Sequence, residues 1–221
     1  MRHILVFARR PVPGRVKTRL SPALPADLAC ALYRGMLRDA LDAAAGCAAG
    51  ERLLYWDEPD GGAELPVPAG LEQRVQSGAD LGARLANAFA EALGAPGDRA
   101  VAIGTDCPGL APDRLEAAFA GLEGHDVVVG PAGDGGYYLL GLARRAPGLF
   151  AGVEWSTPRV LDQTLARARD AGLTVRTLGH LDDLDTPADL ARWVAAAAVA
   201  PPAHARHTLA ALRGMGLLAP P

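Results

Sequence analysis

The first twenty residues of the chain hold a cluster of cations with no acid among them. Lys17 is the only lysine in all 221 residues, and it lies in a Pro- and Gly-containing loop that follows an apolar run. Such a loop between a strand and a helix is where α/β proteins hold phosphates. We therefore expect a di- or triphosphate to be held by Arg9, Gly14, Arg15, Lys17, Thr18 and Arg19.

Two observations limit this expectation. The loop does not match the Walker A pattern, because no glycine stands immediately before Lys17. A basic loop is also often ordinary solvated surface. The position at the end of a strand and the absence of acids favour phosphate binding over a solvated surface.

Asp106 is the carboxylate that such a phosphate would need nearby. It follows Ala100–Ile103, a short apolar run typical of a buried strand. In open α/β sheets, ligands bind outside the carboxyl ends of the strands. Gly104 and Pro108 predict a stiff turn around Asp106. Beside a phosphate loop, Asp106 is a candidate ligand of Mg²⁺ or Mn²⁺, and the alternative is a turn or cap residue.

The acidic segment 183–189 offers a second carboxylate. Thr186 and Asp189 have the spacing of a capping box, which explains them without a metal. Asp183 and Asp185 precede the cap, and their charges repel each other unless a cation or the basic loop is near. For Asp185, a metal or substrate contact and an exposed turn both stay open.

Two further segments could approach a substrate. The run Gly133–Tyr137 presents Asp134 between glycines, so a ligand could come close to its backbone, although a glycine-rich hairpin turn explains it equally well. Trp155 and Ser156 precede a helix whose amides and hydroxyls could hold an anion. A simpler interpretation is that Thr157 caps this helix and Trp155 packs.

Alternating strands and helices must position these side chains. Apolar or β-branched runs predict strands at 3–8, 53–56, 73–76, 100–103, 127–129, 137–142 and 173–178. Helical spacing of apolar residues predicts helices at 28–46, 81–93, 113–122, 157–171 and 187–194. This order predicts βαβ units and a mostly parallel sheet. We expect one domain over residues 1–199 and a helical tail over 200–221.

Composition excludes several classes of protein. With 50% hydrophobic and 21% charged residues, the chain is not disordered. A net charge of −3 gives no general attraction to nucleic acid or membranes. No apolar run is long enough to cross a bilayer, and residues 1–3 lead directly into a strand, so we expect a cytoplasmic protein.

Cys30, Cys47 and Cys107 predict reduced thiols, and the anion of Asp106 disfavours a nucleophilic thiolate at Cys107.

Six segments together resemble one superfamily. The chain is similar to the nucleotide-diphospho-sugar transferases of the GT-A-like fold. More narrowly, it resembles a bacterial group of about this length, domain of unknown function 2064, whose members are often provisionally called glycosyltransferases. The resemblance covers residues 3–195 and rests on residues 7–20, 76–82, 104–108, 133–137, 155–157 and 183–190.

The resemblance implies a Rossmann-like GT-A fold of the α/β class, with three α/β/α layers around a mostly parallel, mixed sheet. It implies Asp106 as a metal ligand, Asp185 as a second one, and Lys17 and Arg19 on the phosphates. It also implies that Asp134, Gly135 and Tyr137 face an acceptor or sugar. We expect Gly136, Trp155 and Ser156 to line the same acceptor or sugar site. The first and last motifs also resemble phosphoenolpyruvate or phospholactate guanylyltransferases, but the Gly-Gly-Tyr segment departs from them, so their acceptor is not carried over.

Two reactions and one non-catalytic role are compatible with these residues. In nucleotidyl transfer, a nucleoside triphosphate lies along the basic loop, and a small phosphorylated or carboxylate acceptor attacks its α-phosphorus, releasing pyrophosphate. In glycosyl transfer, a nucleotide-diphospho-sugar binds the same face, and an acceptor hydroxyl attacks the anomeric carbon. We place nucleotidyl transfer first because of the many cations, with Lys17, Asp106 and Asp134 as candidate catalytic residues. A nucleotide sensor is the third hypothesis, and a homo-oligomer is compatible with all three.

Overall fold

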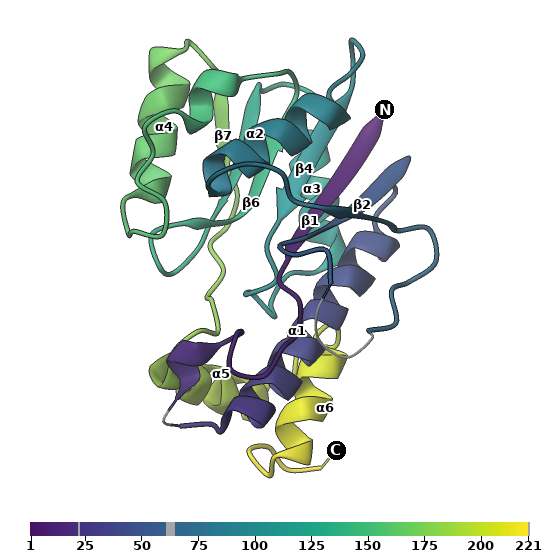
Figure 1. Ribbon diagram of the computed structural model, residues 1–221, viewed down its shortest axis with the longest axis vertical. Helices are drawn as coiled ribbons and strands as arrows, with labels where there is room; N and C mark the ends of the chain where they lie inside the picture. Colours follow the sequence, from purple (N-terminus) through teal and green to yellow (C-terminus); the bar gives the residue numbers. More distant parts are fainter. Residues whose placement is uncertain (22, 61–64, 221) are drawn as a thin grey trace.

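One mixed sheet of seven strands forms the centre of the molecule (Figure 1). The computed structural model describes residues 1–21, 23–60 and 65–220. The strands are β1 (Arg2–Ala8), β2 (Glu51–Trp56), β3 (Glu72–Val75), β4 (Arg99–Ile103), β5 (Val127–Pro131), β6 (Tyr137–Leu142) and β7 (Val175–Thr177). Their order is β3-β2-β1-β4-β6-β5-β7. Only β6 runs antiparallel to its neighbours in this described sheet, which confirms the predicted mostly parallel arrangement.

Helices cover both faces of the sheet. They are α1 (Ala26–Gly46), α2 (Leu81–Ala92), α3 (Pro112–Gly121), α4 (Val160–Asp170), α5 (Pro187–Val199) and α6 (Arg206–Gly214), with short 3₁₀ turns η1 (Thr18–Leu20) and η2 (Pro147–Phe150). Alternate side chains of β1 point to opposite faces. Ile4 and Val6 pack in the core that includes α1 and α3, whereas Leu5 packs in the core that includes α2, η2 and α4. The predicted three-layer α/β/α class is therefore confirmed.

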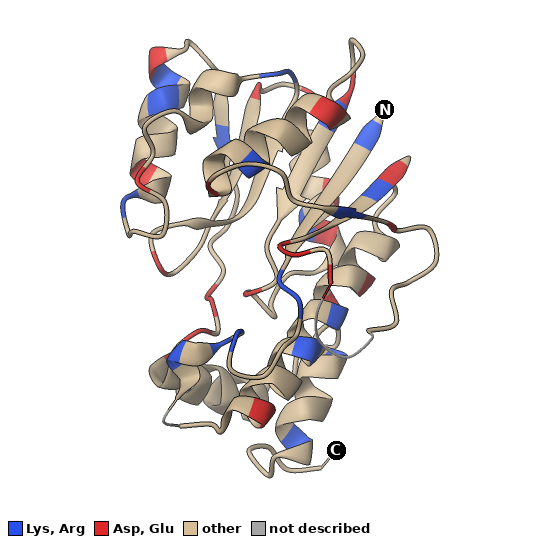
Figure 2. Cartoon of the chain, viewed as in Figure 1, with Lys and Arg blue, Asp and Glu red and all other residues tan. Residues whose placement is uncertain are grey.

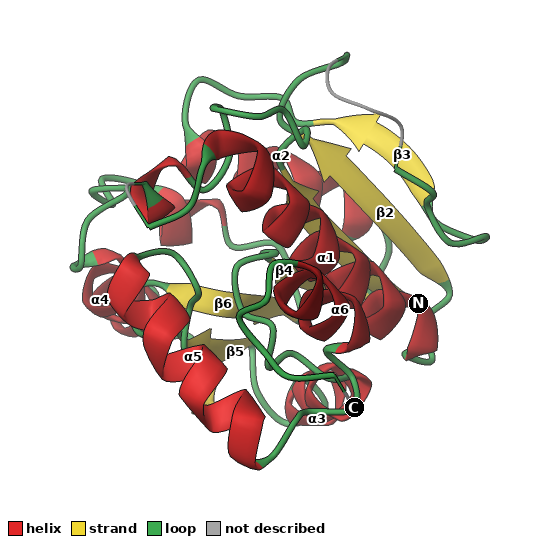
Figure 3. Cartoon of the chain, turned by 90° about the horizontal axis from the view of Figure 1, so that it is seen from below, coloured by secondary structure: helices red, strands yellow, loops and turns green. Residues whose placement is uncertain are grey.

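A third, smaller core lies beyond the carboxyl ends of the strands. At 1.5 Å per residue, the 21 residues of α1 span about 30 Å, longer than the strands beside it. The excess length packs with η1, α5 and α6 through residues that include Leu20, Leu32, Leu184, Leu190 and Leu212. Figure 3, seen from below, shows α5 and α6 at this end of the molecule. The loops that leave β1 and β4 are thus held between the sheet and this small core.

Three local predictions differ from the structure. Helix α4 begins at Val160 with Arg159 as its N-cap, so the expectation that Thr157 caps it is wrong. The hydroxyl of Thr157 instead accepts a hydrogen bond from the Arg159 backbone in the turn before the helix. Strand β7 is shorter than the predicted 173–178, and α5 continues to Val199, five residues beyond its predicted end.

The last part of the chain contains the helix expected there. Helix α6 packs on α1, and its Leu209 and Leu212 are buried. The separation of residues 1–199 from a tail at 200–221 stays a prediction. In the part of the chain that the structure describes, every helix is too short or too polar to cross a membrane.

Candidate functional site

The carboxyl ends of β1, β2 and β4 open into a cavity of about 850 Å³. It is bordered by the loop after β1, the turn after β4, the β5–β6 turn and the segments before α4 and α5. Figure 2 shows basic and acidic segments on these loops. The predicted site residues that line it are Arg9, Arg15, Lys17, Thr18, Arg19, Asp106, Asp134, Gly136, Tyr137, Trp155, Ser156 and Asp185. Gly14 and Gly135 do not line it.

Lys17 joins the two carboxylates that the sequence analysis proposed as metal ligands. Its Nζ donates to Asp106 Oδ1 at 2.5 Å and to Asp185 Oδ1 at 3.2 Å. Arg19 Nη1 donates to the other oxygen of Asp185 at 2.9 Å. The Lys17 side chain is 2% exposed, whereas Asp106 is 54% exposed. The predicted phosphate ligands and the predicted metal ligands therefore pair with one another.

The backbone at Lys17 is held in an unusual conformation. Its φ of 49° and ψ of 35° lie in the left-handed region, which residues with a Cβ seldom adopt. Ser156, which also lines the cavity, has a φ of 63°. Among the described residues, these are the two non-glycine positions with positive φ. Such strain occurs most often at functional sites, where the surrounding structure enforces it.

The charges of this cluster support one another. Burial lowers the pKa of Lys17, but the carboxylates of Asp106 and Asp185 outweigh it and raise the pKa above 10.5. Partial desolvation of the Asp106 carboxylate within the cavity raises its pKa, but the ammonium of Lys17 outweighs this and brings the pKa below 3.8. Both groups are therefore charged at neutral pH.

The other cations of the loop differ in what they face. Arg15 forms a two-pronged pair with Glu58, with both N–O distances at 3.0 Å, so its charge is already matched outside the Lys17 cluster. Arg9 lines the cavity, and its charge helps to lower the pKa of Asp106. Gly14 has a φ of 77°, which shows that it serves the turn of the loop.

Tyr33 on α1 is a site residue that the sequence analysis missed. Its buried hydroxyl accepts from the Arg9 N–H at 2.8 Å and donates to the Arg9 carbonyl at 3.1 Å. It also accepts from the Thr105 hydroxyl at 3.3 Å. Tyr33 thus ties the exit of β1 to the exit of β4, beside Asp106. In the sequence it is simply one more core position of a helix, so no signal distinguished it.

The sequence analysis named Asp183 in the acidic segment but did not assign it to the site. It lines the cavity, accepts from the Cys107 thiol at 3.0 Å and from the Asp134 N–H at 3.2 Å. Burial, with Asp134 and Asp106 nearby, raises the pKa of Asp183. Burial also raises the pKa of Cys107, in line with the expectation that it is not a thiolate nucleophile. The available signal was that the capping box leaves Asp183 unexplained.

Packing and hydrogen bonds within the protein explain most features of the glycine-rich turn at residues 133–137. Gly135 has a φ of 86°, and a Cβ there would collide with the Pro158 carbonyl oxygen, so this close approach serves packing. Asp134 Oδ1 accepts from the Gly136 N–H at 2.8 Å, which stabilises the turn. The Tyr137 hydroxyl is buried beside Thr164, and burial raises its pKa. Asp134 and Gly136 are left as the members of this turn best placed toward the cavity.

Trp155 packs against neighbouring residues, as the simpler of the two interpretations from the sequence predicted. Its ring stacks on Phe150 with centroids 6.5 Å apart, and a Cβ at Gly82 would collide with the indole. Trp155 nevertheless also lines the cavity. Its packing fixes the start of the segment that presents Ser156.

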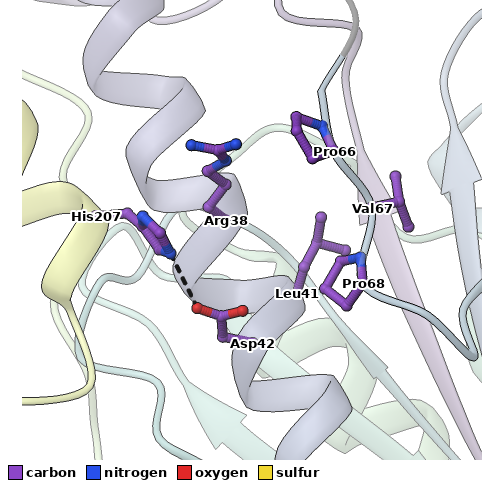
Figure 4. Close-up of a pocket in the computed structure, with 7 residues that line it drawn as sticks. All are labelled: Arg38, Leu41, Asp42, Pro66, Val67, Pro68 and His207. Atoms are coloured by element: carbon purple, nitrogen blue, oxygen red, sulfur yellow. Dashed lines mark hydrogen bonds and ion pairs between the residues drawn. The ribbon is translucent and has the colours of Figure 1, made fainter.

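A separate acidic group lies between α1 and α6. Among the described residues, Asp39, Asp42 and His207 form the one group of potential metal ligands whose atoms lie within 4.8 Å of one another. Figure 4 shows His207 pointing toward Asp42 beside a smaller pocket. Both oxygens of Asp39 accept backbone N–H groups, from His207 at 2.9 Å and Thr208 at 2.8 Å. We therefore assign Asp39 as the acceptor that caps the N-terminus of α6.

Comparison with known proteins gives the family. The model of DUF2064, described as an uncharacterized protein conserved in bacteria, matches residues 40–157. The chain belongs to this family. The matched region includes Asp106 and the β5–β6 turn, and it leaves out Lys17, Asp183 and Asp185.

Solved structures confirm the fold that the resemblance implied. A protein from Desulfovibrio desulfuricans G20, provisionally described as a nucleotide-diphospho-sugar transferase, is 33% identical, with 98% of this chain and 96% of that chain covered and a TM-score of 0.86. CMP:2-keto-3-deoxy-manno-octonic acid synthetase complexed with CTP is 16% identical, with 90% of this chain and 98% of that chain covered and a TM-score of 0.53. 2-C-methyl-D-erythritol 4-phosphate cytidylyltransferase from Thermus thermophilus is 17% identical, with 88% and 98% covered and a TM-score of 0.52.

At these low identities, the last two structures show the fold alone. A search among curated proteins gives no significant match. These comparisons establish the family and the fold. The reaction has to be inferred from the residues that line the cavity.

Proposed function

We propose that this protein is a metal-dependent transferase that moves a nucleotidyl group from a nucleoside triphosphate to a small phosphorylated or carboxylate acceptor, with release of pyrophosphate. The observation that carries the proposal is the meeting of Lys17 with Asp106 and Asp185 in one cavity, at distances of 2.5 and 3.2 Å. Phosphate-binding cations and hard oxygen ligands are the two sets of groups that this chemistry requires in one place.

The carboxylates fit a divalent cation. Asp106 and Asp183 both line the cavity, and Asp185 lies beside Lys17. Mg²⁺ and Mn²⁺ prefer carboxylate oxygens, and Asp106 is open enough to exchange its partner. When bound there, such an ion would neutralise the phosphates and the charge that develops on departing pyrophosphate. Asp106 is the principal proposed ligand, with Asp185 as the second.

The protein's own residues bind and orient the reactants. Lys17, Arg19 and Arg9 hold the phosphates, so that an acceptor oxygen can attack the α-phosphorus while the bond from that phosphorus to the pyrophosphate oxygen breaks. Asp134 and the Gly136 backbone face the acceptor. Positioning and charge stabilisation are sufficient for this reaction, and no covalent intermediate is needed. Residues 1–199 are proposed to form the catalytic domain, with α6 supporting α1.

Glycosyl transfer from a nucleotide-diphospho-sugar is the second candidate. The provisional description of the D. desulfuricans relative favours it. In that reaction Asp134 would contact the sugar or accept the acceptor proton. The two candidates differ in the ligand they require, a triphosphate in one case and a sugar diphosphate in the other.

The test is thermal stabilisation by nucleoside triphosphates, nucleoside diphosphates and nucleotide-sugars, each with and without Mg²⁺ or Mn²⁺. A ligand that binds only the folded state raises the melting temperature. A metal-dependent shift with one triphosphate, followed by pyrophosphate release with phosphorylated acids, is the expected result. A shift confined to nucleotide-sugars and diphosphates would favour glycosyl transfer, and binding with no turnover of any acceptor would favour a sensor.

A further inference from the structure

We propose that Lys17 makes the site selective for a divalent cation and phosphates bound together, and against either one alone. This inference rests on the proposed function and names the ligand form that the site accepts. Its starting point is that the Lys17 ammonium lies where a cation shared by Asp106 and Asp185 would lie, within hydrogen-bonding distance of both.

A divalent cation alone meets competition at this position. To bind Asp106 and Asp185 it must displace the ammonium, which already makes charge-assisted hydrogen bonds to both. The displaced ammonium cannot simply enter solvent, because the side chain is 2% exposed and its backbone is fixed in the left-handed conformation. A buried ammonium without an anionic partner is strongly unfavourable.

Phosphates alone meet the opposite difficulty. They could attract Lys17 and Arg19, but both cations already pair with carboxylates, and taking them away would leave Asp106 and Asp185 facing a polyphosphate. Like charges in a partly desolvated cavity repel strongly. Only simultaneous binding supplies a new partner for every group, with the carboxylates on the divalent cation and the ammonium on the phosphates.

The test uses ligands without a base, since the base is unknown. Binding of MnCl₂, of sodium tripolyphosphate and of their preformed complex is measured by titration calorimetry on the full chain. The wild-type protein is expected to bind the complex at least about tenfold more tightly than either component, a normal size for coupling between two ligands. Equal affinity for Mn²⁺ alone and for the complex would overturn the proposal.

Lys17→Met gives the sharper arm of the test. Removing the competing ammonium should strengthen binding of Mn²⁺ alone by about tenfold relative to wild type and weaken binding of the complex. Arg169→Met, which removes one positive charge from the exposed face of α4 outside the cavity, is the matched control and should leave Mn²⁺ affinity unchanged. If Lys17→Met binds Mn²⁺ no more tightly than wild type, the proposal is wrong.

These outcomes are separable from those that test the proposed function. If no nucleotide binds or turns over, the proposed function fails, yet a gain of Mn²⁺ affinity in Lys17→Met still shows that the ammonium occupies the cation position. If Lys17→Met does not fold, as judged by circular dichroism, the comparison of complex with components in the wild-type protein decides the matter.

Discussion

Two clusters of aspartates and bases in this molecule have similar composition and different organisation. Between α1 and α6, Asp39 is 2% exposed, and both its oxygens accept backbone N–H groups. In the cavity, the Asp106 and Asp185 side chains pair with the side-chain cations of Lys17 and Arg19. Within the described part of the chain, neither of these two carboxylates accepts a backbone donor.

The type of hydrogen-bond donor distinguishes a cluster that only stabilises the fold from one whose carboxylates can exchange their partners. A backbone N–H in the first turn of a helix is held in place by the helix and cannot move to another anion, so Asp39 is committed to α6. A side-chain cation can move to another anion, so Asp106 and Asp185 can change partners. An acidic cluster alone therefore does not indicate a metal site, and the nature of its donors distinguishes the two cases.

Asp106→Asn should have the largest effect. Loss of the charge removes the principal proposed metal ligand, and metal-dependent pyrophosphate release should fall by about a hundredfold or more, while folding is retained. Asp42→Asn in the α1–α6 cluster is the control and should keep full activity. Unchanged turnover in Asp106→Asn would remove the proposed metal role.

Asp39→Ala should act on stability instead. It leaves two backbone N–H groups at the start of α6 without their acceptor, which should lower the free energy of unfolding by about 2–3 kcal/mol. Urea denaturation measures this loss. Asp42→Ala, whose side chain is 33% exposed, should lower it by less than about 1 kcal/mol. Equal losses in the two variants would contradict the assignment of Asp39 as the cap.

Lys17→Ala should reduce affinity for the metal–triphosphate complex by about 10- to 30-fold, because one charge-assisted contact to phosphate is lost. Titration calorimetry measures the affinity, and the melting curve should stay cooperative. A variant that loses its cooperative melt and binds nucleotide as before would show that the loop is purely structural.

The smallest effect is on the pH dependence of stability. Because the folded pKa of Asp106 lies below 3.8, its pairing with Lys17 stabilises the fold above that pH, and the contribution is lost as pH falls through the lowered value. The raised pKa of Lys17 means that the contribution is present below 10.5 and lost as pH rises through the raised value. The stability difference between wild type and Lys17→Met should therefore shrink at both extremes, as measured by urea midpoints.

The contribution of Asp39 to the pH dependence of stability should have the opposite sign to that of Asp106. Burial raises its pKa above 3.8, so the folded state binds its proton more tightly, and its contribution to stability decreases as pH rises through the range between the ordinary and the raised value. In Asp39→Asn this component of the pH dependence should disappear. A pH profile identical to that of wild type would show that Asp39 does not titrate differently in the folded state.

Local patterns predicted the elements well where local forces decide them. The capping box of Thr186 and Asp189 forms as its spacing indicated, because both its hydrogen bonds lie within one helical turn. Asp106 follows the predicted strand at its carboxyl end. The predicted start of α4 was wrong. The Thr157 hydroxyl forms hydrogen bonds with the Glu154 carbonyl and the Arg159 backbone N–H in a turn that precedes the helix.

The sequence by itself determined the α/β alternation, the basic loop and the positions of the acids relative to strand ends, because hydrophobic periodicity and turn chemistry act over a few residues. Only the tertiary structure decided which charges meet. Lys17 and Asp185 are 168 residues apart, and Arg15 is drawn to Glu58 instead of the cluster. Such pairings depend on sheet order and on the small core of η1, α1, α5 and α6, which no local pattern encodes.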